Sequence, residues 1–141
     1  ALSMGNVLCF DAACADYALF PLKARFQNCI FVGSRADQIT LIDRLNDGSQ
    51  FDYDFKNCIV RVKDLLKPTA NPEFLDHCQP CLTVDGQDTI FVDVNERDFH
   101  LDTLHSVANK YNIPVPRKEK DLDGKARDAS MPDAGCYEIE F

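Results

Sequence analysis

The stretch from Asp88 to Tyr111 constrains the fold of this chain more than any other. Within residues 89–94, apolar side chains fall on both faces of an alternating pattern, which is typical of a strand in the middle of a sheet. Residues 95–98 form a polar joint, and the apolar residues of 99–111 then recur at helical spacing. The stretch therefore predicts a strand-turn-helix unit with its strand at the centre of a sheet.

Other segments extend this architecture. The 141 residues fit one domain, 1–141, which buries about two-thirds of its unfolded surface. Charged residues with interspersed Pro and Gly predict a long surface loop over 114–135 within this domain. Helices are predicted over 12–20, 34–45 and 73–78, and strands over 7–10, 29–32, 81–84 and 136–141. The predicted fold class is α/β or α+β: a single domain with a mixed β-sheet of about five to seven strands and two or three helices. We identify no internal repeat.

A β-hairpin is predicted over residues 51–62. Residues 51–55 alternate strictly between aromatic and acidic side chains, and a two-residue turn at Lys56-Asn57 would bring them back against residues 58–62. The apolar side chains then share one face: Phe51, Tyr53, Phe55, Cys58, Val60 and Val62.

The net charge of −8 indicates the class of partner. Such a potential repels phosphate backbones, which argues against nucleic acid as a ligand, and it can steer the protein toward a basic protein surface. No apolar run reaches the roughly 18 residues of a membrane span, and the first ten residues lack the pattern of a signal peptide. These features predict no membrane association.

Seven cysteines are many for this length, and the number is odd. A disulfide framework in a secreted protein normally uses an even number. Cys9, Cys29 and Cys58 lie within apolar runs, where a thiol packs as a small apolar side chain. The cysteines therefore predict a reducing compartment, the cytoplasm.

Two cysteine positions are candidate sites for thiol or metal chemistry. Cys78 and Cys81 are spaced C-x-x-C beside His77, a pattern that suits one metal ion, a small disulfide or a pair of reduced thiols, and we favour the thiols. The proline between the two cysteines resembles the C-x-P-C of thioredoxin-like redox proteins. Cys14 falls in the first turn of a predicted helix, where the helix dipole would activate a nucleophile. A packed cysteine is the competing interpretation there.

Polar residues follow three of the predicted strands. In open α/β sheets ligands collect at the carboxyl ends of parallel strands, so these residues would share one rim. The candidate ligand-binding residues are Asp11, Ser34, Arg35, Asp93 and Glu96. Helix capping is the competing interpretation for the acidic members.

Three functional hypotheses follow, none of which indicates a particular cofactor. The first is a non-enzymatic interaction module, such as a regulator, an inhibitor or an immunity-like protein, that binds a basic protein partner. The second is a thiol- or metal-dependent enzyme that uses Cys78 and Cys81 or Cys14. The third is a small-ligand binder at the strand-end rim. No catalytic set assembles from the sequence, which favours the first hypothesis over an enzyme.

Overall fold

The computed structural model describes residues 1–86, 88–109, 111 and 119–139, and this part of the chain is built from short β-strands. It contains eleven strands and one 3-10 helix. The strands are β1 (Leu2–Gly5), β2 (Val7–Cys9), β3 (Tyr17–Leu19), β4 (Leu22–Gln27), β5 (Ile30–Phe31), β6 (Ile39–Ile42), β7 (Phe51–Lys56), β8 (Cys58–Val60), β9 (Cys81–Thr83), β10 (Phe91–Asp93) and β11 (Asp98–Leu101), and the helix is η1 (Pro72–His77).

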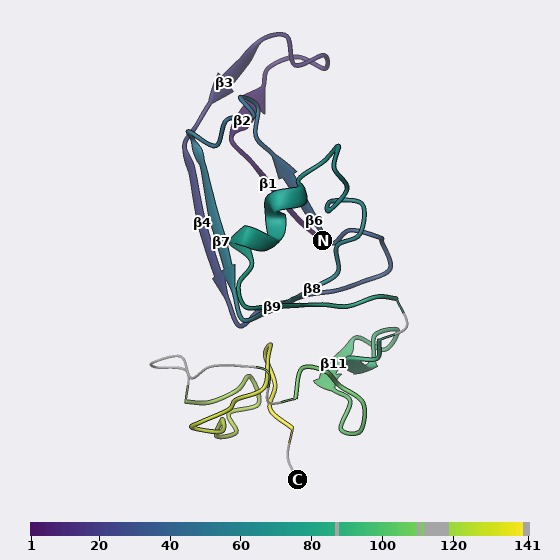
Figure 1. Ribbon diagram of the computed structural model, residues 1–141. Helices are drawn as coiled ribbons and strands as arrows, with labels where there is room; N and C mark the ends of the chain where they lie inside the picture. Colours follow the sequence, from purple (N-terminus) through teal and green to yellow (C-terminus); the bar gives the residue numbers. More distant parts are fainter. Residues whose placement is uncertain (87, 110, 112–118, 140–141) are drawn as a thin grey trace.

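The first sixty residues wind into a three-sided coil of two stacked turns. β1, β4 and β5 form the three sides of the first turn, and they pair in parallel with β6, β7 and β8 of the second turn in the same order. The three stacked pairs enclose a triangular outline (Figure 1). β9 pairs in parallel with β8 and adds one side of a third turn. The coil is therefore a short solenoid, in which successive turns bury a shared core.

The same residues make the same corner in both turns. Asn28 and Asn57 have positive φ values of 58° and 50°, a left-handed conformation that asparagine tolerates better than most residues. Each stands in the sequence Phe-x-Asn-Cys-Ile, at residues 26–30 and again at 55–59. Ile30 pairs with Ile59 across the two turns. The chain thus carries an internal repeat of one coil turn, which our reading of the sequence overlooked.

Aromatic rings fill the centre of the coil. Phe55 is fully buried, and its ring stacks on that of Phe26 in the turn below at a centroid distance of 4.7 Å. On its other side the ring of Phe74 lies 5.5 Å away. Phe74 belongs to η1, which is drawn inside the triangular outline in Figure 1, and its side chain is fully buried. The helix therefore closes the coil at the end of the second turn.

A second core lies on the outer side of β8. The side chains of Cys58 and Val60 point into the coil, whereas Ile59 points outward into a cluster of residues from the C-terminal part of the chain. All three are fully buried, so β8 is covered on both faces. The second cluster consists of Ile59, Val84, Ile90, Leu101, Ala108 and Ala134.

The predicted fold class is wrong, because the described residues contain no α-helix. The longest helix there is the six-residue η1, which lies where a helix was expected over 73–78. Over 12–20 the chain forms part of the loop and the second strand of the hairpin β2–β3 instead, and in that loop the Asp11 carboxylate accepts hydrogen bonds from the amides of Ala13, Ala15 and Asp16. Within 34–45 the chain forms β6, which pairs with β1.

The expected strand-turn-helix unit is also absent. β10 pairs only with β11 among the described strands, and Val92 is 55% exposed, so this strand is not at the centre of a sheet. In place of a helix the chain forms β11 and then tight turns. The Asp102 carboxylate accepts the backbone amides of Leu104 and His105, a local bond that competes with helix formation.

The hairpin predicted at 51–62 is wrong in its pairing and right in its shared face. β7 and β8 lie on adjacent sides of one turn and pair with β4 and β5 in parallel. The corner at Asn57 turns the chain without reversing it, so the six apolar side chains still face one core.

Two predictions concern the chain as a whole. Residues 119–135 of the expected surface loop contain one isolated bridge, between Lys120 and Ala126, whereas 114–118 lie outside the described residues. That residues 1–141 form a single domain stays a prediction. Among the described residues, no helix is long and apolar enough to cross a membrane.

Candidate functional site

A pocket opens where the strands of the third side of the coil end. β5, β8 and β9 run in parallel, and the segments that follow them surround a hollow of about 750 Å³. We call this hollow the strand-end pocket. Its lining residues are Ser34, Ala36, Arg61, Val62, Lys63, Thr83, Val84, Asp85, Gly86 and Asp88.

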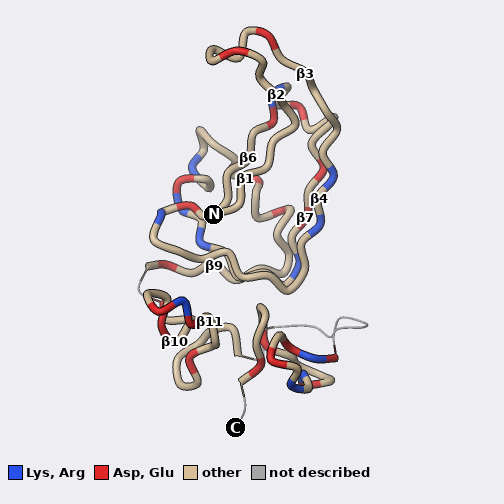
Figure 2. The backbone as a smooth tube through the Cα atoms, turned by 180° about the vertical axis from the view of Figure 1, so that it is seen from behind, with Lys and Arg blue, Asp and Glu red and all other residues tan. Residues whose placement is uncertain are grey.

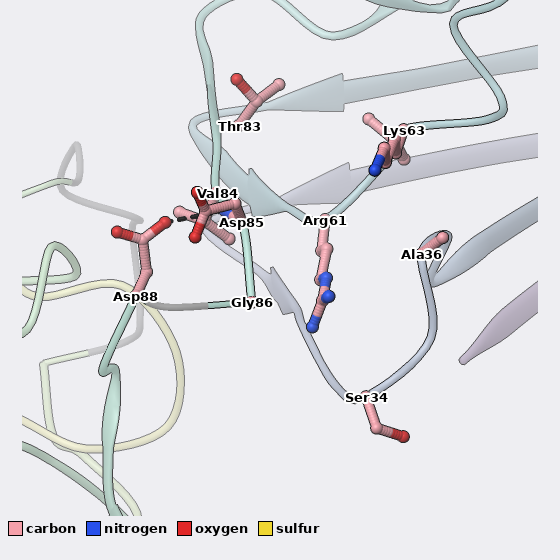
Figure 3. A pocket seen from close by; sticks show the side chains of 10 residues that line it. Ser34, Ala36, Arg61, Lys63, Thr83, Val84, Asp85, Gly86 and Asp88 are labelled. Atoms are coloured by element: carbon pink, nitrogen blue, oxygen red, sulfur yellow. Dashed lines mark hydrogen bonds between the residues drawn. The ribbon is translucent and has the colours of Figure 1, made fainter.

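Arg61 lies at the centre of the strand-end pocket, between the segments that carry Ser34 and Gly86 (Figure 3). Its guanidinium Nη1 donates a hydrogen bond of 2.5 Å to the carbonyl oxygen of Gly33. A Cβ atom on Gly86 would lie 2.6 Å from the other terminal nitrogen, so the guanidinium occupies this position only because residue 86 has no side chain. The remaining guanidinium donors have the planar geometry that suits a carboxylate or phosphate.

Two carboxylates fix the walls of the strand-end pocket by accepting hydrogen bonds from backbone amides. One carboxylate oxygen of Asp37 accepts the backbone amides of Lys63, Asp64 and Leu65 at 2.6, 3.0 and 3.2 Å. On the opposite wall, Asp88 accepts the amide of Asp85 at 2.7 Å. The pocket thus places two basic side chains and two acidic ones in one preformed hollow.

A second hollow, of about 530 Å³, has four acidic side chains among its ten lining residues, and we call it the acidic groove. It lies between η1, β7 and the segment that precedes β7. Four carboxylates line it, and His77 is the only basic side chain in the lining. The lining residues are Asp43, Asn46, Asp47, Gly48, Phe51, Asp52, Tyr53, Asn71, Glu73 and His77.

Hydrogen bonds favour the ionised forms of two of the groove carboxylates, Asp52 and Asp43. The Arg25 guanidinium binds both oxygens of Asp52 and, as the largest cause, lowers the pKa of Asp52 below its ordinary value. Burial alone would raise the pKa of Asp43, but the amide of Gly48 and the side chain of Asn6 outweigh that effect and lower the pKa. Both groups therefore stay negative under mildly acidic conditions.

The floor of the groove is aromatic. The ring of Tyr53 lies 4.7 Å from the ring of His77, and burial, with a smaller effect from the charge of Glu73, raises the pKa of Tyr53 to about 12. Tyr53 is therefore a neutral hydrogen-bonding group at physiological pH.

The predicted rim of ligand-binding residues does not form one surface. Ser34 lines the strand-end pocket and Arg35 follows it in the chain, but Asp11 lies in the loop between β2 and β3. Asp93 and Glu96 lie at the turn between β10 and β11, where the Asp93 carboxylate accepts the amides of Asn95 and Glu96. Figure 1 shows the β2–β3 hairpin and β11 at opposite ends of the molecule. Ligand binding by these residues stays a prediction.

The candidate cysteines are joined in disulfides. Cys14 pairs with Cys9 and Cys78 pairs with Cys81, with Cα–Cα distances of 4.7 and 5.3 Å. Our preference for reduced thiols at Cys78 and Cys81 is therefore wrong, and in this state Cys14 has no thiolate. Catalysis at these positions stays a prediction. His77 faces Tyr53, and among the described residues no three His, Cys, Asp or Glu side chains are arranged to hold a metal ion.

A column of cysteines follows the corners of the coil. The corner cysteines of the first two turns, Cys29 and Cys58, are free, and Cys81 occupies the equivalent position in β9. A hydrogen bond between the side chains of Cys29 and Cys58 lowers the pKa of Cys29 to about 7. The same contact, together with burial, raises the pKa of Cys58. The repeated Asn-Cys pair is the sequence signal that could have revealed both this column and the coil.

The acidic groove was missed because the packing of η1 against β7 was not predicted. Asp52 was treated as the polar face of a hairpin strand, and Glu73 as part of a short helix between prolines. The ring contacts of Tyr53 with Phe74 and His77 hold η1 on β7 and so bring Glu73 to the other three carboxylates.

Comparison of the chain with protein families, with curated proteins and with solved structures yields no match. The function therefore has to be argued from the two hollows and from the charge around them. Figure 2 shows acidic residues both on the coil and in the C-terminal part of the chain.

Proposed function

We propose that this protein is a binding module that holds a positively charged segment of a protein partner in its acidic groove. The observation that carries the proposal is the convergence of four carboxylates on one hollow, in a chain whose net charge is −8. A hollow of about 530 Å³ lies within the size range of sites that enclose a small ligand or one or two side chains.

The groove is organised for a cation before any partner arrives. Asp43 and Asp52 are fixed by hydrogen bonds that favour their charged forms, so little rearrangement is needed on binding. The carboxylate of Glu73 lies on the outer, exposed side of η1, where it can meet a lysine or arginine side chain. The net negative charge would speed the encounter with a basic partner at low salt.

A peptide series tests this proposal. Short peptides rich in lysine or arginine, and a matched series in which glutamine replaces the basic residues, are titrated into the protein by calorimetry at low and at physiological salt. We expect the basic peptides alone to bind, and the affinity to fall as the salt concentration rises.

Groove variants identify the site. Glu73→Gln and Asp47→Asn each remove one charge from the groove, and each is expected to lower the affinity for the basic peptide about two- to fivefold. Glu96→Gln removes an equal charge at the β10–β11 turn and serves as the control, with unchanged affinity expected. Equal affinity for basic and glutamine peptides, or equal losses in all three variants, would show that the groove is not the site.

The strand-end pocket supports a second candidate function, the binding of a small anionic ligand. The observation in its favour is the Arg61 guanidinium, held in place by the Gly33 carbonyl at the centre of a hollow of about 750 Å³. In a thermal-shift screen, small carboxylates or phosphate should raise the melting temperature of the wild type and of Arg35→Gln. They should not raise the melting temperature of Arg61→Gln. A stabilisation that survives Arg61→Gln argues against this pocket.

The two disulfides bear on the compartment. We infer an oxidising environment for the chain, in place of the cytoplasm expected from the odd cysteine count, because Cys9–Cys14 and Cys78–Cys81 are both closed. Mass spectrometry of protein that is denatured and alkylated without reductant, directly after isolation from its native source, should find both pairs protected. Alkylation of all seven cysteines would restore the cytoplasmic prediction.

A further inference from the structure

The two ends of the coil are covered to different extents. At the end of the second turn, η1 covers the core with the buried ring of Phe74. At the other end the first turn has no helix of this kind over it among the described residues, and its inward side chains, apart from buried Met4, are only partly buried. These partly buried residues are Leu2, Leu22, Ala24, Phe26, Cys29 and Phe31, and they pack against a second turn whose equivalents are at most 7% exposed.

The strands of the first turn are also the edge strands of their sheets. β1 and β4 each pair with one strand only within the described chain, and β5 is the outer strand of its three-stranded sheet. Leu22 donates its amide to Gln50 and Asn28 donates its amide to Lys56, both toward the second turn. Since successive amides of a strand point to opposite sides, those of Lys23, Arg25 and Gln27 point to the open edge. A long unpaired edge of this kind is a template for another strand.

We propose that the open end of the first turn is a stacking surface for one further turn of parallel β-coil with the same three sides. The contact would repeat the interface already present between the first and second turns, with apolar side chains over Leu22, Ala24 and Phe26. In a solenoid each repeat is stabilised by its neighbours, and an end that is not stacked is normally covered by a capping element.

Charge indicates what this occupant carries on its outer face. In the backbone register Lys23 lies beside Asp52 and Arg25 beside Asp54, and the Arg25 guanidinium binds both oxygens of Asp52, so a basic face of the first turn lies beside an acidic face of the second. Figure 2 shows basic and acidic segments side by side along β4 and β7. An occupant with acidic residues at the equivalent positions would complement the other side of Lys23 and Arg25.

A second copy of this chain does not fit the same surface. Two copies related by a two-fold axis would pair their strands antiparallel, so that β4 meets β4 while β1 meets β5. β1 has four residues and β5 has two, so these sides do not match in length. On the β4 side, a register centred on Ala24 would place Lys23 opposite Arg25, and like charges in that position destabilise the pair. Parallel stacking avoids both conflicts.

The test adds such a turn to the full chain. A copy of residues 39–60, followed by a copy of the connecting residues 32–38, is placed before Leu2, with Cys58→Ala in the copy so that no thiol is added. This copy has the three sides of the second turn and its acidic residues. The control extension is identical except for Phe51→Ser, Tyr53→Ser and Phe55→Ser in the copy.

The readout is the alkylation rate of Cys29, which is half-buried near the open end, with exposed Cys136 as the internal reference. We expect the extension to slow the alkylation of Cys29 at least tenfold and to leave the alkylation rate of Cys136 unchanged. It should also slow hydrogen exchange at the amides of Lys23, Arg25 and Gln27. The control extension should change none of these rates.

Two results would overturn the proposal. One is an extension that leaves Cys29 and the three amides of β4 as accessible as in the unextended chain, whether or not the extension is itself folded. The other is a concentration-dependent dimer of the unextended chain, seen by sedimentation velocity, in which Cys29 and those amides are protected, because the occupant would then be a second copy.

Discussion

Replacing Phe55 by alanine tests the aromatic core of the coil most directly. The Phe55 side chain is fully buried, and the rings of Phe26, Phe31 and Phe74 lie 4.7, 5.6 and 5.5 Å from it. Those rings belong to the first turn and to η1, so Phe55 joins both turns of the coil to the helix that closes it. Loss of the ring leaves a cavity that the surrounding strands cannot fill without breaking their register.

The expected effect of Phe55→Ala is a loss of free energy of unfolding. Phe→Ala substitutions in protein cores lower the free energy of unfolding by about 3–5 kcal/mol. We expect about 4 kcal/mol here, a large share of the roughly 5–15 kcal/mol that stabilises a typical protein. With a denaturant slope of about 2 kcal/mol per molar urea, the unfolding midpoint should fall by about 2 M.

Urea unfolding followed by circular dichroism measures this shift, with Phe10→Ala as the matched control. Phe10 is 61% exposed and lies at the end of the β2–β3 hairpin, so its removal should cost less than about 1 kcal/mol. Equal midpoints for the two variants would refute the stacked-turn arrangement of the core.

Three further predictions concern the bonds that fix the loops. Asp37→Ala removes the acceptor of the Lys63, Asp64 and Leu65 amides and should lower the free energy of unfolding by about 1–3 kcal/mol, measured by urea unfolding. His100 lies between Asp123 and Asp98, whose hydrogen bonds raise its pKa. Its stabilising contribution is therefore complete below the ordinary histidine pKa and is lost as the pH rises through the raised value, so the melting temperature should fall over that range in the wild type and less in His100→Gln. Alkylation of the native protein without reductant should modify exposed Cys136 first, half-buried Cys29 more slowly and fully buried Cys58 only on unfolding.

The apolar faces were predictable from the sequence, but their arrangement was not. Alternation over 51–62 identified six side chains of one core correctly, because the period of a strand is the same in parallel and antiparallel pairs. The partner strand was misassigned because the corner at Asn57 was treated as a reversal. The second Phe-x-Asn-Cys-Ile sequence at 26–30 carried the missing information, since two identical corners indicate stacked turns.

The predicted helices failed for a local reason. Asp11 was assigned to the start of one helix and Asp102 lay inside another, and both accept backbone amides from the residues that follow. Those bonds close tight loops instead, the first of them beside the Cys9–Cys14 disulfide. Ser34 was correctly placed after a strand, but its pocket neighbours Arg61 and Asp85 come from later turns of the coil.

The burial of β8 on both faces determines how this molecule can come apart. Cys58 and Val60 belong to the coil, while Ile59 between them belongs to the C-terminal cluster. Detaching the C-terminal cluster would put Ile59 in water, and melting the coil would deprive that cluster of its supporting wall. β8 and its neighbours β5 and β9, which also contribute to both clusters, therefore couple the two cores, and heat or force should release them in a single step.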